Sequence, residues 1–253
     1  MTVITIAARK GGNGKSTSAL NLAGAFALKG YKVLLIDLDD QKNTTSCLET
    51  KIPPAWTVED LLVNAQVPAE EAAIQTAWPG VSLIASSAGL SGVIRELEAE
   101  PGSHGFLQEK LSACTSFDYC FIDTSPSLNI LVVNALCASR WLFVPLSSQY
   151  FSLQGLGQTL DSFNKIRNRL NPVLELAGLA FVQHDKRSHL AGEVMEKARE
   201  EYPQLVCSSV VGKNIKIEEA QVLHQSIFAY APLDRGAVQY QALADELLAR
   251  IGG

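Results

Sequence analysis

Residues 9–17 read Arg9-Lys10-Gly11-Gly12-Asn13-Gly14-Lys15-Ser16-Thr17. They follow a short run of β-forming residues at positions 3–7 and lead into residues 18–29, whose apolar side chains recur at helical spacing. A strand, a glycine-rich turn and a helix in this order form the setting of a phosphate-binding loop. Glycines let successive backbone N–H groups converge on one anion, and the N-terminus of the helix adds a positive field. We therefore expect Lys15 to reach the β- and γ-phosphates of a nucleotide and the Ser16 hydroxyl to hold Mg²⁺.

The strict pattern of a glycine, four residues and Gly-Lys-Ser fails at its first position, where Arg9 stands, and a second lysine, Lys10, opens the loop. The segment resembles the deviant Walker A box of the ParA/MinD family of ATPases. That resemblance implies ATP and Mg²⁺ as cofactors and a homodimer, formed on ATP binding, in which Lys10 contacts the partner's nucleotide. The alternative is a glycine-rich turn that merely contains two lysines. The nucleotide-binding residues that the resemblance implies here are Lys10, Gly11, Gly12, Asn13, Gly14, Lys15, Ser16 and Thr17.

A second acidic site follows the apolar run at residues 32–37, which suits a strand covered on both faces of a parallel sheet. Carboxylates at the carboxyl end of such a strand can bind Mg²⁺ or orient a water. The stretch Asp37-Leu38-Asp39-Asp40-Gln41-Lys42-Asn43 resembles the family's Asp-x-Asp-Pro-Gln-Gly-Asn signature. The resemblance implies that Asp39 orients the attacking water, as a catalytic residue beside Lys10 and Lys15, and that Asp37 supports the metal. Asp40 and Lys42 replace the family's proline and glycine, which leaves the loop shape open; a solvated acidic turn is the alternative.

A third site ends the apolar run at residues 117–123. Asp123 stands where a Walker B carboxylate would hold Mg²⁺ through water, although a strand-end residue without a role is the alternative. The next residues, Thr124-Ser125-Pro126-Ser127, resemble the family's γ-phosphate switch, with Ser125 for a proline and Asn129 where glycine is common. The two departures leave the shape of this loop open as well.

The remaining pattern predicts the fold class. Helices are expected over residues 15–29, 91–100, 105–113, 129–138, 152–171 and 190–202, with one more beginning at Thr57 and a closing helix to residue 251. Strands are expected at residues 3–7, 32–37, 81–85, 117–123, 141–145 and 176–182. Alternating strands and helices imply βαβ units with right-handed crossovers. We expect one α/β domain over residues 1–253, a doubly wound, mostly parallel sheet flanked by helices of the P-loop NTPase type.

Residues 206–220 contain Lys213-Asn214-Ile215-Lys216 and resemble the family's Ile-Pro-Arg-Asn-Val-Arg-Leu-Ser-Glu-Ala stretch, with lysines for its arginines. The resemblance implies that Asn214 lies near the adenine and that Lys213 and Lys216 bind DNA, to which we add Arg187. Contacts to phosphates alone give salt-sensitive binding without sequence preference. The alternative is a solvated face whose lysines pair with nearby acids within the chain. Further candidate cations are Lys165, Arg167, Arg169 and Lys186.

Bulk properties restrict the class of protein. The chain has 253 residues, of which 47% are apolar and 19% charged, as in a globular protein with a substantial core. A net charge of −5 argues against an overall basic protein but permits a local basic patch. The five cysteines contain no Cys-x-x-Cys pair, which suggests buried thiols. Their spacing also argues against a relationship to the iron–sulfur cluster-binding members of this ATPase class. We see no signal peptide, membrane span or N-terminal helix-turn-helix, and expect a cytoplasmic, nucleoid-associated protein.

The resemblance covers nearly the whole chain and implies a DNA partition or positioning ATPase. In this hypothesis, the ATP-bound sandwich dimer binds DNA non-specifically, and a ParB-like adaptor on the cargo stimulates the hydrolysis that releases it. Whether the cargo is a plasmid, a chromosome or another body is left open.

Two other functions are alternatives. A MinD-like ATPase would insert a terminal amphipathic helix into a membrane. Here the polar face of the last helix carries two acids, Asp245 and Glu246, and one base, Arg250, so anionic lipid would attract it little. We therefore expect a packed closing helix. A small-molecule ligase or metallochaperone would use the same ATPase core. The absence of ligand-spaced cysteines and of an additional acceptor domain argues against it.

Overall fold

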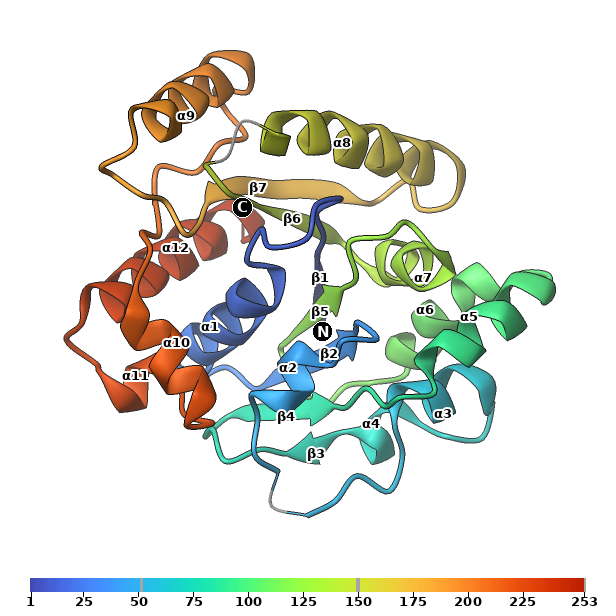
Figure 1. Cartoon of the computed structure of the whole chain (residues 1–253). Helices are drawn as coiled ribbons and strands as arrows, with labels where there is room; N and C mark the ends of the chain where they lie inside the picture. The colour runs from blue at the N-terminus through green and yellow to red at the C-terminus, as the bar shows by residue number, and fades with distance from the viewer. Residues whose placement is uncertain (51, 149–150, 253) are drawn as a thin grey trace.

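The computed structural model describes residues 1–50, 52–148 and 151–252. A seven-stranded sheet runs through these residues in the order β3-β4-β2-β5-β1-β6-β7, with helices on both faces (Figure 1). All neighbouring strands are parallel except β3, which is antiparallel to β4 at the edge. The doubly wound, mostly parallel α/β fold expected from the sequence is confirmed. The strands are β1 (Thr2–Ile6), β2 (Val33–Leu38), β3 (Ile74–Gln75), β4 (Val81–Ile84), β5 (Tyr119–Thr124), β6 (Trp141–Leu146) and β7 (Glu175–Phe181).

The expected helices are present with ends shifted by one or two residues. The sequence analysis did not foresee several short elements, namely β3, α2, α4, α11 and a 3₁₀ turn. Segments of two to four residues are too short to show a periodicity, so only their tertiary contacts define them. The helices are α1 (Lys15–Leu28), α2 (Asn43–Ser46), α3 (Val58–Val63), α4 (Ala69–Ala72), α5 (Leu90–Ala99), η1 (Ser103–Gly105), α6 (Phe106–Ser112), α7 (Ile130–Ala138), α8 (Phe151–Arg169), α9 (His189–Glu201), α10 (Ile215–Val222), α11 (Ile227–Tyr230) and α12 (Arg235–Ile251).

The core divides along the sheet because successive strand residues point to opposite faces. Ile4 and Ile6 of β1 pack with α1, α10, α11 and α12, whereas Val3 packs with α3, α5, α6 and α7 on the other face. A third cluster joins β6 and β7 to α8 and α9. Every residue of β2 is buried, as expected for a strand covered on both sides.

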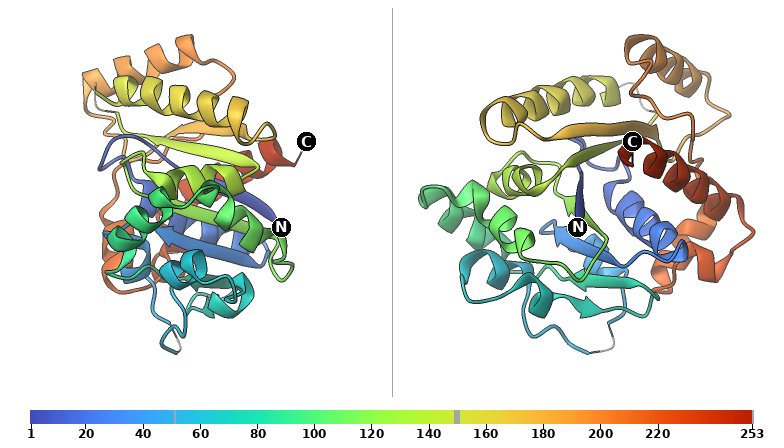
Figure 2. Two further views of the ribbon diagram at one scale, coloured as in Figure 1. Left: turned by 90° about the vertical axis from the view of Figure 1, so that its right-hand side faces the viewer. Right: turned by 180° about the vertical axis from the view of Figure 1, so that it is seen from behind.

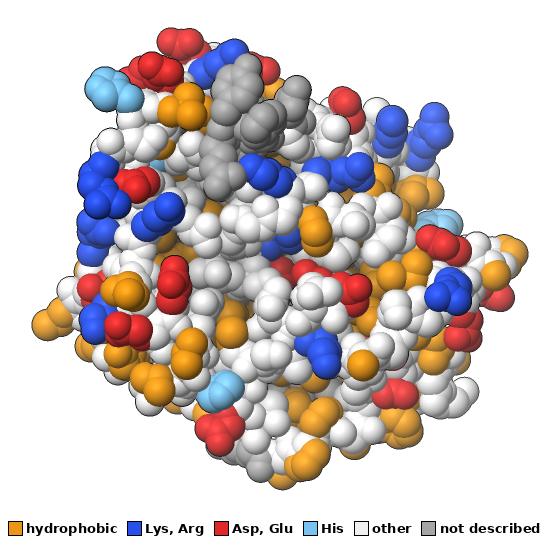
Figure 3. Space-filling model, in the orientation of Figure 1, with side chains coloured by type: hydrophobic (Ala, Val, Ile, Leu, Met, Phe, Trp, Pro, Cys, Tyr) orange, Lys and Arg blue, Asp and Glu red, His pale blue; other side chains and the backbone are white. Residues whose placement is uncertain are grey.

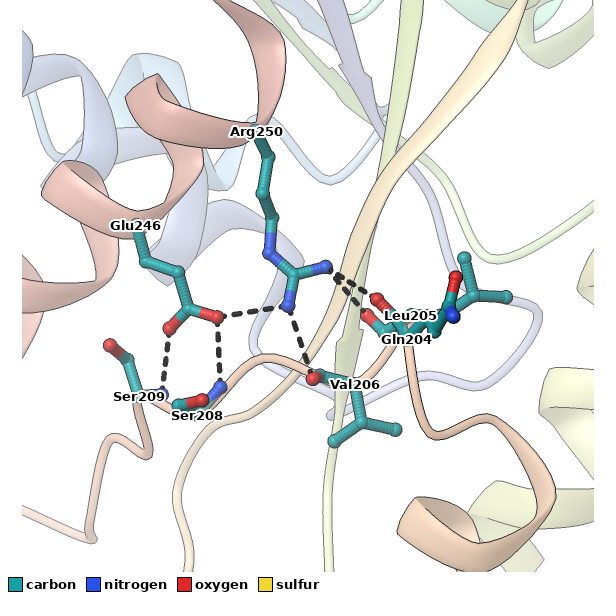
Figure 4. Close-up of polar contacts among 7 residues, drawn as sticks. All are labelled: Gln204, Leu205, Val206, Ser208, Ser209, Glu246 and Arg250. Atoms are coloured by element: carbon teal, nitrogen blue, oxygen red, sulfur yellow. Dashed lines mark hydrogen bonds and ion pairs between the residues drawn. The ribbon is translucent and has the colours of Figure 1, made fainter. Parts of the chain in front are cut away.

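The closing helix α12 is part of this core. Its buried side includes Tyr240, Leu243 and Leu247, which are each at most 1% exposed. At its end, Arg250 donates to the carbonyl oxygens of residues 204–206 at 3.0–3.3 Å and pairs with Glu246 at 2.9 Å (Figure 4). Glu246 accepts hydrogen bonds from two backbone N–H groups of the same loop, each at 2.8 Å. The packed closing helix expected from the sequence is therefore present.

The parallel strands bring their carboxyl ends to one side of the molecule. The loop between β1 and α1 lies on the side that faces the viewer in Figure 1, and both termini lie on the opposite side, seen from behind in Figure 2. No helix in the described part of the chain is long and apolar enough to cross a membrane.

Candidate functional site

The phosphate loop joins β1 to α1 in the backbone conformation that its glycines permit. Gly12 and Gly14 have φ angles of 74° and 73°, in the left-handed region that favours glycine. A Cβ on Gly14 would also approach Val182 to 3.0 Å. Asn13 is 3% exposed and accepts a hydrogen bond from the Ser147 hydroxyl at 2.9 Å, which ties the loop to the end of β6. Lys10 is half-buried at the start of the loop.

A cavity of about 360 Å³ opens above this loop. Of the predicted nucleotide-binding residues, Gly11, Gly12, Gly14, Lys15, Ser16 and Thr17 line it, and so does Asp39. Lys10 and Asn13 do not line it. Gln183 and Gln221 line the cavity too, although the sequence analysis assigned them no role. Neither residue belongs to a motif, so only the folded chain identifies them.

The three predicted carboxylates meet below this cavity. Parallel pairing places Asp37 of β2 in register with Asp123 of β5, and Asp39 follows two residues after Asp37. Asp37 accepts hydrogen bonds from the Thr45 hydroxyl at 2.7 Å, the Thr45 N–H at 2.8 Å and the Asp39 N–H at 3.1 Å. Asp123 accepts one from the Thr44 hydroxyl at 2.8 Å, while its Oδ1 is buried and accepts no hydrogen bond from the part of the chain that the structure describes. Thr44 and Thr45 on α2 are therefore functional candidates that the sequence analysis missed.

Burial controls the ionisation of this group. It raises the pKa of Asp123 and of Asp37, and their mutual repulsion raises the pKa of Asp123 further. Burial lowers the pKa of Lys15, an effect opposed by the negative charges of Asp123 and Asp39. In each case burial removes water from the charged form of the side chain and so favours the neutral form. A bound cation would favour the ionised carboxylates, which burial alone disfavours.

The residues present fit Mg²⁺. The Asp123 Oδ1 atom is a buried acceptor without a hydrogen-bond partner, which is costly unless a ligand completes it. Ser16 lies at the start of α1 on the wall of the same cavity, and hydroxyl and carboxylate oxygens are ligands that Mg²⁺ prefers. Ser16 and Asp123, supported by Asp37, would hold the ion, and the loop N–H groups would hold the phosphates.

The loop after β2 keeps a shape typical of glycine although it carries Lys42. This residue has φ 54° and ψ 32°, in the left-handed region. Its N–H donates to the Asp39 carbonyl at 3.0 Å, and its carbonyl accepts from Ser46 at 2.8 Å. A left-handed conformation costs a residue with a Cβ about 1–2 kcal/mol, which the surrounding hydrogen bonds offset. The substitution therefore leaves this turn in place.

The other departure from the family pattern also has a structural role. Asn129 precedes α7 and accepts hydrogen bonds from Leu131 and Val132 at 3.1 and 3.2 Å, as an N-cap residue does. The helix after the switch segment thus begins with a side-chain cap where a glycine would provide none.

Asn214 caps α10 through a hydrogen bond from the Lys216 N–H at 2.8 Å, and its own amide donates to Asp234. It is not among the residues that line the cavity. The predicted adenine contact would therefore need the cavity to extend toward α10, where Gln221 already lines it.

The predicted DNA-binding cations differ in their surroundings. Lys216 pairs with Glu219 at 2.8 Å and Arg187 with Asp185 at 3.1 Å, as in the alternative of pairing within the chain. Lys213 is exposed, and no ion pair of its side chain occurs in the part of the chain that the structure describes. Two backbone hydrogen bonds join His184, three residues before Arg187, to Val211 and Lys213. Figure 3 shows Lys and Arg side chains gathering on the left-hand edge over this region.

Comparison with known proteins identifies the family. Residues 1–176 match the family described as an AAA domain. The chain is 35% identical to the chromosome partitioning protein ParA of Caulobacter vibrioides over 254 residues, which cover 99% of this chain and 95% of that protein. It is also 35% identical to the chromosome-partitioning ATPase Soj of Treponema pallidum, covering 96% of both chains.

Solved structures agree on the fold. The cobyrinic acid a,c-diamide synthase of Mycobacterium smegmatis, solved with a bound ATP analogue and magnesium, superposes with a TM-score of 0.84 at 26% identity, covering 100% of this chain and 96% of that one. Apo McdA from Cyanothece gives a TM-score of 0.87 at 23% identity, covering 98% and 99% of the two chains. The chain therefore belongs to the AAA-domain family of P-loop ATPases and, within it, to the ParA/Soj group of partition ATPases.

Proposed function

We propose that this chain is a Mg²⁺-dependent ATPase that positions a cargo by binding DNA in its ATP-bound, dimeric form. Hydrolysis, stimulated by a ParB-like adaptor protein, releases the DNA. The observation that carries the proposal is the convergence of the phosphate loop with Asp37, Asp39 and Asp123. They meet at one edge of the sheet, in a chain similar over its full length to ParA.

The residues of the site would share the hydrolysis of ATP as follows. The loop N–H groups and Lys15 bind the β- and γ-phosphates, and Asp39, which is 4% exposed and lines the cavity, orients the attacking water. The Gln41 N–H donates to Asp39 Oδ1 at 3.1 Å and fixes that carboxylate. Mg²⁺, when bound, neutralises charge on the phosphates. Positioning and electrostatic stabilisation supply the catalysis, because phosphoryl transfer needs little covalent chemistry from the protein.

Dimerisation through Lys10 rests on the position of this residue. Lys15 already supplies the cation that a phosphate loop needs, and Lys10 stands half-buried at the start of the loop, outside the residues that line the cavity. A lysine from each chain reaching the other chain's triphosphate would make dimer stability depend on the γ-phosphate. Nucleotide state can shift such an equilibrium only by binding the two states with different affinity.

DNA binding is supported by the basic edge that contains Lys186, Arg187, Lys213 and Arg235. Arg235 donates to the Lys213 carbonyl at 2.9 Å, so the start of α12 holds the loop that carries Lys213. Of the three predicted contacts, Lys213 is the best placed, because Lys216 and Arg187 are already paired with acids. A two-fold dimer would present two such edges to the same duplex.

The membrane alternative requires a terminal helix that can leave the protein. The apolar side of α12 is buried against the sheet, and Glu246 and Arg250 clamp its end to the neighbouring loop (Figure 4). Releasing it would expose core residues such as Tyr240 and Leu247. We therefore favour DNA over a lipid surface as the partner of the dimer.

The ligase alternative cannot be judged from chain length. This chain covers 96% of the structurally similar synthase from Mycobacterium smegmatis. That synthase chain therefore has little room for a separate acceptor domain, and the lack of one here does not argue against a ligase. Partition and ligase functions instead differ in whether DNA changes the ATPase rate.

The proposal is tested by a salt-titrated gel shift on random-sequence DNA with ATP, ADP or no nucleotide. We expect a shift only with ATP, lost in Lys10→Ala and weakened in Lys213→Glu. The matched control is Lys32→Glu, which makes the same charge change at an exposed lysine just before β2, at the amino ends of the strands, and should leave DNA binding unchanged. Asp39→Ala should bind ATP and dimerise but remain on DNA. DNA binding that ignores the nucleotide, or normal hydrolysis by Asp39→Ala, would contradict the proposal.

A further inference from the structure

A second cavity lies on the other side of the sheet from α1 and α12. It is a groove of about 500 Å³ between α3, α5 and α6, and it shares no lining residue with the nucleotide cavity. Its floor is apolar, because Leu62 and Leu97 lie there with 2% exposure each. Val63, which is 44% exposed, and the half-buried Phe106 extend the apolar surface up its walls.

The rim of this groove is acidic. Glu96, Glu100 and Glu109 line it, and none forms an ion pair within the described ranges of the chain. Lys110 is the basic residue of the lining, but its ammonium group donates to the carbonyl oxygens of Asn64, Ala65 and Val67 at 2.7–2.9 Å. Its hydrogen-bonding capacity is thereby used at the end of α3. The lining therefore carries three carboxylates and one ammonium group, which leaves it with an excess of negative charge.

This arrangement opposes the stability of α5. Glu96 lies in the last turn of α5 and Glu100 is the extended residue that follows the helix, so two like charges stand near the same helix end. The C-terminus of a helix also carries partial negative charge, which disfavours acidic residues there. Figure 3 shows acidic, hydrophobic and basic side chains together at the right-hand edge, over α5. A cation bound here would relieve both repulsions.

We propose that this groove docks a cationic amphipathic helix of a partner protein. The apolar side of such a helix would cover Leu62, Val63, Leu97 and Phe106. Its Arg or Lys side chains would reach Glu96, Glu100 and Glu109 and the carbonyl end of α5. A helix lying in a groove between helices is an established way of recognising an amphipathic segment. The proposal requires neither ATP nor DNA binding, so it can fail independently of the proposed function.

Fluorescence anisotropy with a synthetic peptide tests this. The probe is a labelled peptide of about 15 residues with Leu at helical spacing on one side and Arg on the other, and its matched control carries Glu in place of Arg. We expect the Arg peptide to bind and the Glu peptide not to bind. Binding should fall about tenfold in Glu96→Gln/Glu100→Gln/Glu109→Gln, and also in Val63→Asp, which places a charge on the apolar wall.

A matched protein variant separates docking from general attraction to an acidic protein. Glu193→Gln/Glu196→Gln/Glu200→Gln changes the net charge equally on the exposed side of α9 and should leave binding within about twofold. Hydrogen exchange should show protection by the peptide in α3, α5 and α6. Equal weakening by the α9 variant, no effect of Val63→Asp, protection elsewhere or no binding of the Arg peptide would each overturn the proposal. Light scattering could instead show that the protein dimerises through the groove without peptide. The groove would then bind a second copy of this chain, and the proposal would be wrong.

Discussion

The hydroxyl of Thr44 should set the pH at which the metal site becomes functional. Thr44 and Asp123 are both fully buried, and the hydroxyl donates to Asp123 Oδ2 at 2.8 Å. Thr44→Val replaces the hydroxyl with a methyl group of similar shape, so the packing around α2 is preserved while Asp123 loses its hydrogen-bond donor. Asp123 has to be ionised to support Mg²⁺ in the proposed mechanism.

The size of the effect follows from the strength of that bond. A hydrogen bond to a charged group contributes about 1.5–3 kcal/mol, and one pKa unit corresponds to about 1.4 kcal/mol. Burial already raises the pKa of Asp123, and the Thr44 hydroxyl opposes this rise by stabilising the ionised form. Removing the hydroxyl should raise the pKa further, by about one to two units. The ionised carboxylate would then be present only at higher pH.

The assay is the pH dependence of kcat/KM for ATP hydrolysis at saturating Mg²⁺. We expect the acidic limb of the Thr44→Val profile to move to higher pH by about one unit or more, with activity recovering on the alkaline side. Lower Mg²⁺ concentrations should enlarge the difference, because the proton and the metal compete for the same carboxylate.

A buried threonine away from the site is the control. Thr5 on β1 is also fully buried and donates to the Ala135 carbonyl at 3.0 Å, so Thr5→Val costs a comparable hydrogen bond. It should reduce stability without moving the pH profile. A Thr44→Val profile of unchanged shape, lowered equally at every pH, would refute the reasoning, as would an equal shift in Thr5→Val.

Three further predictions concern stability and access. Arg250→Ala should lower the free energy of unfolding by about 2–3 kcal/mol, because three carbonyls and Glu246 lose a charged donor. The measurement is a denaturant titration, and a change below about 0.5 kcal/mol would contradict the prediction. Lys42→Gly should leave the free energy of unfolding unchanged or raise it by up to about 1 kcal/mol, because the relief of left-handed strain is partly offset by the entropy of glycine. Lys42→Val should lower it. The opposite order in the same titration would be inconsistent with the φ of 54°. Cys47 lines the nucleotide cavity and is half-buried, whereas the other four cysteines are buried. Mg–ADP should therefore slow the labelling of Cys47 by a maleimide, measured by mass spectrometry at mildly alkaline pH. An unchanged labelling rate would place the nucleotide elsewhere.

The sequence alone determined the features that depend on neighbouring residues. The phosphate loop at residues 9–17, the apolar strands that end at Asp37 and Asp123, and the longer helices between them were predictable. Glycine positions and hydrophobic periodicity act within one turn or one strand. For this reason the predicted fold class is confirmed, whereas the nucleotide-binding roles of the loop residues stay predictions.

Only the tertiary structure decided how those pieces meet. The strand order places β5 between β1 and β2, so that Asp37 and Asp123 come into register. Asp123 accepts a hydrogen bond from the Thr44 hydroxyl and Asp37 accepts one from the Thr45 hydroxyl. Pairing and burial depend on contacts between distant parts of the chain, which a local pattern does not record. The sequence therefore predicts which residues could act, and the fold determines which charges are available to do so.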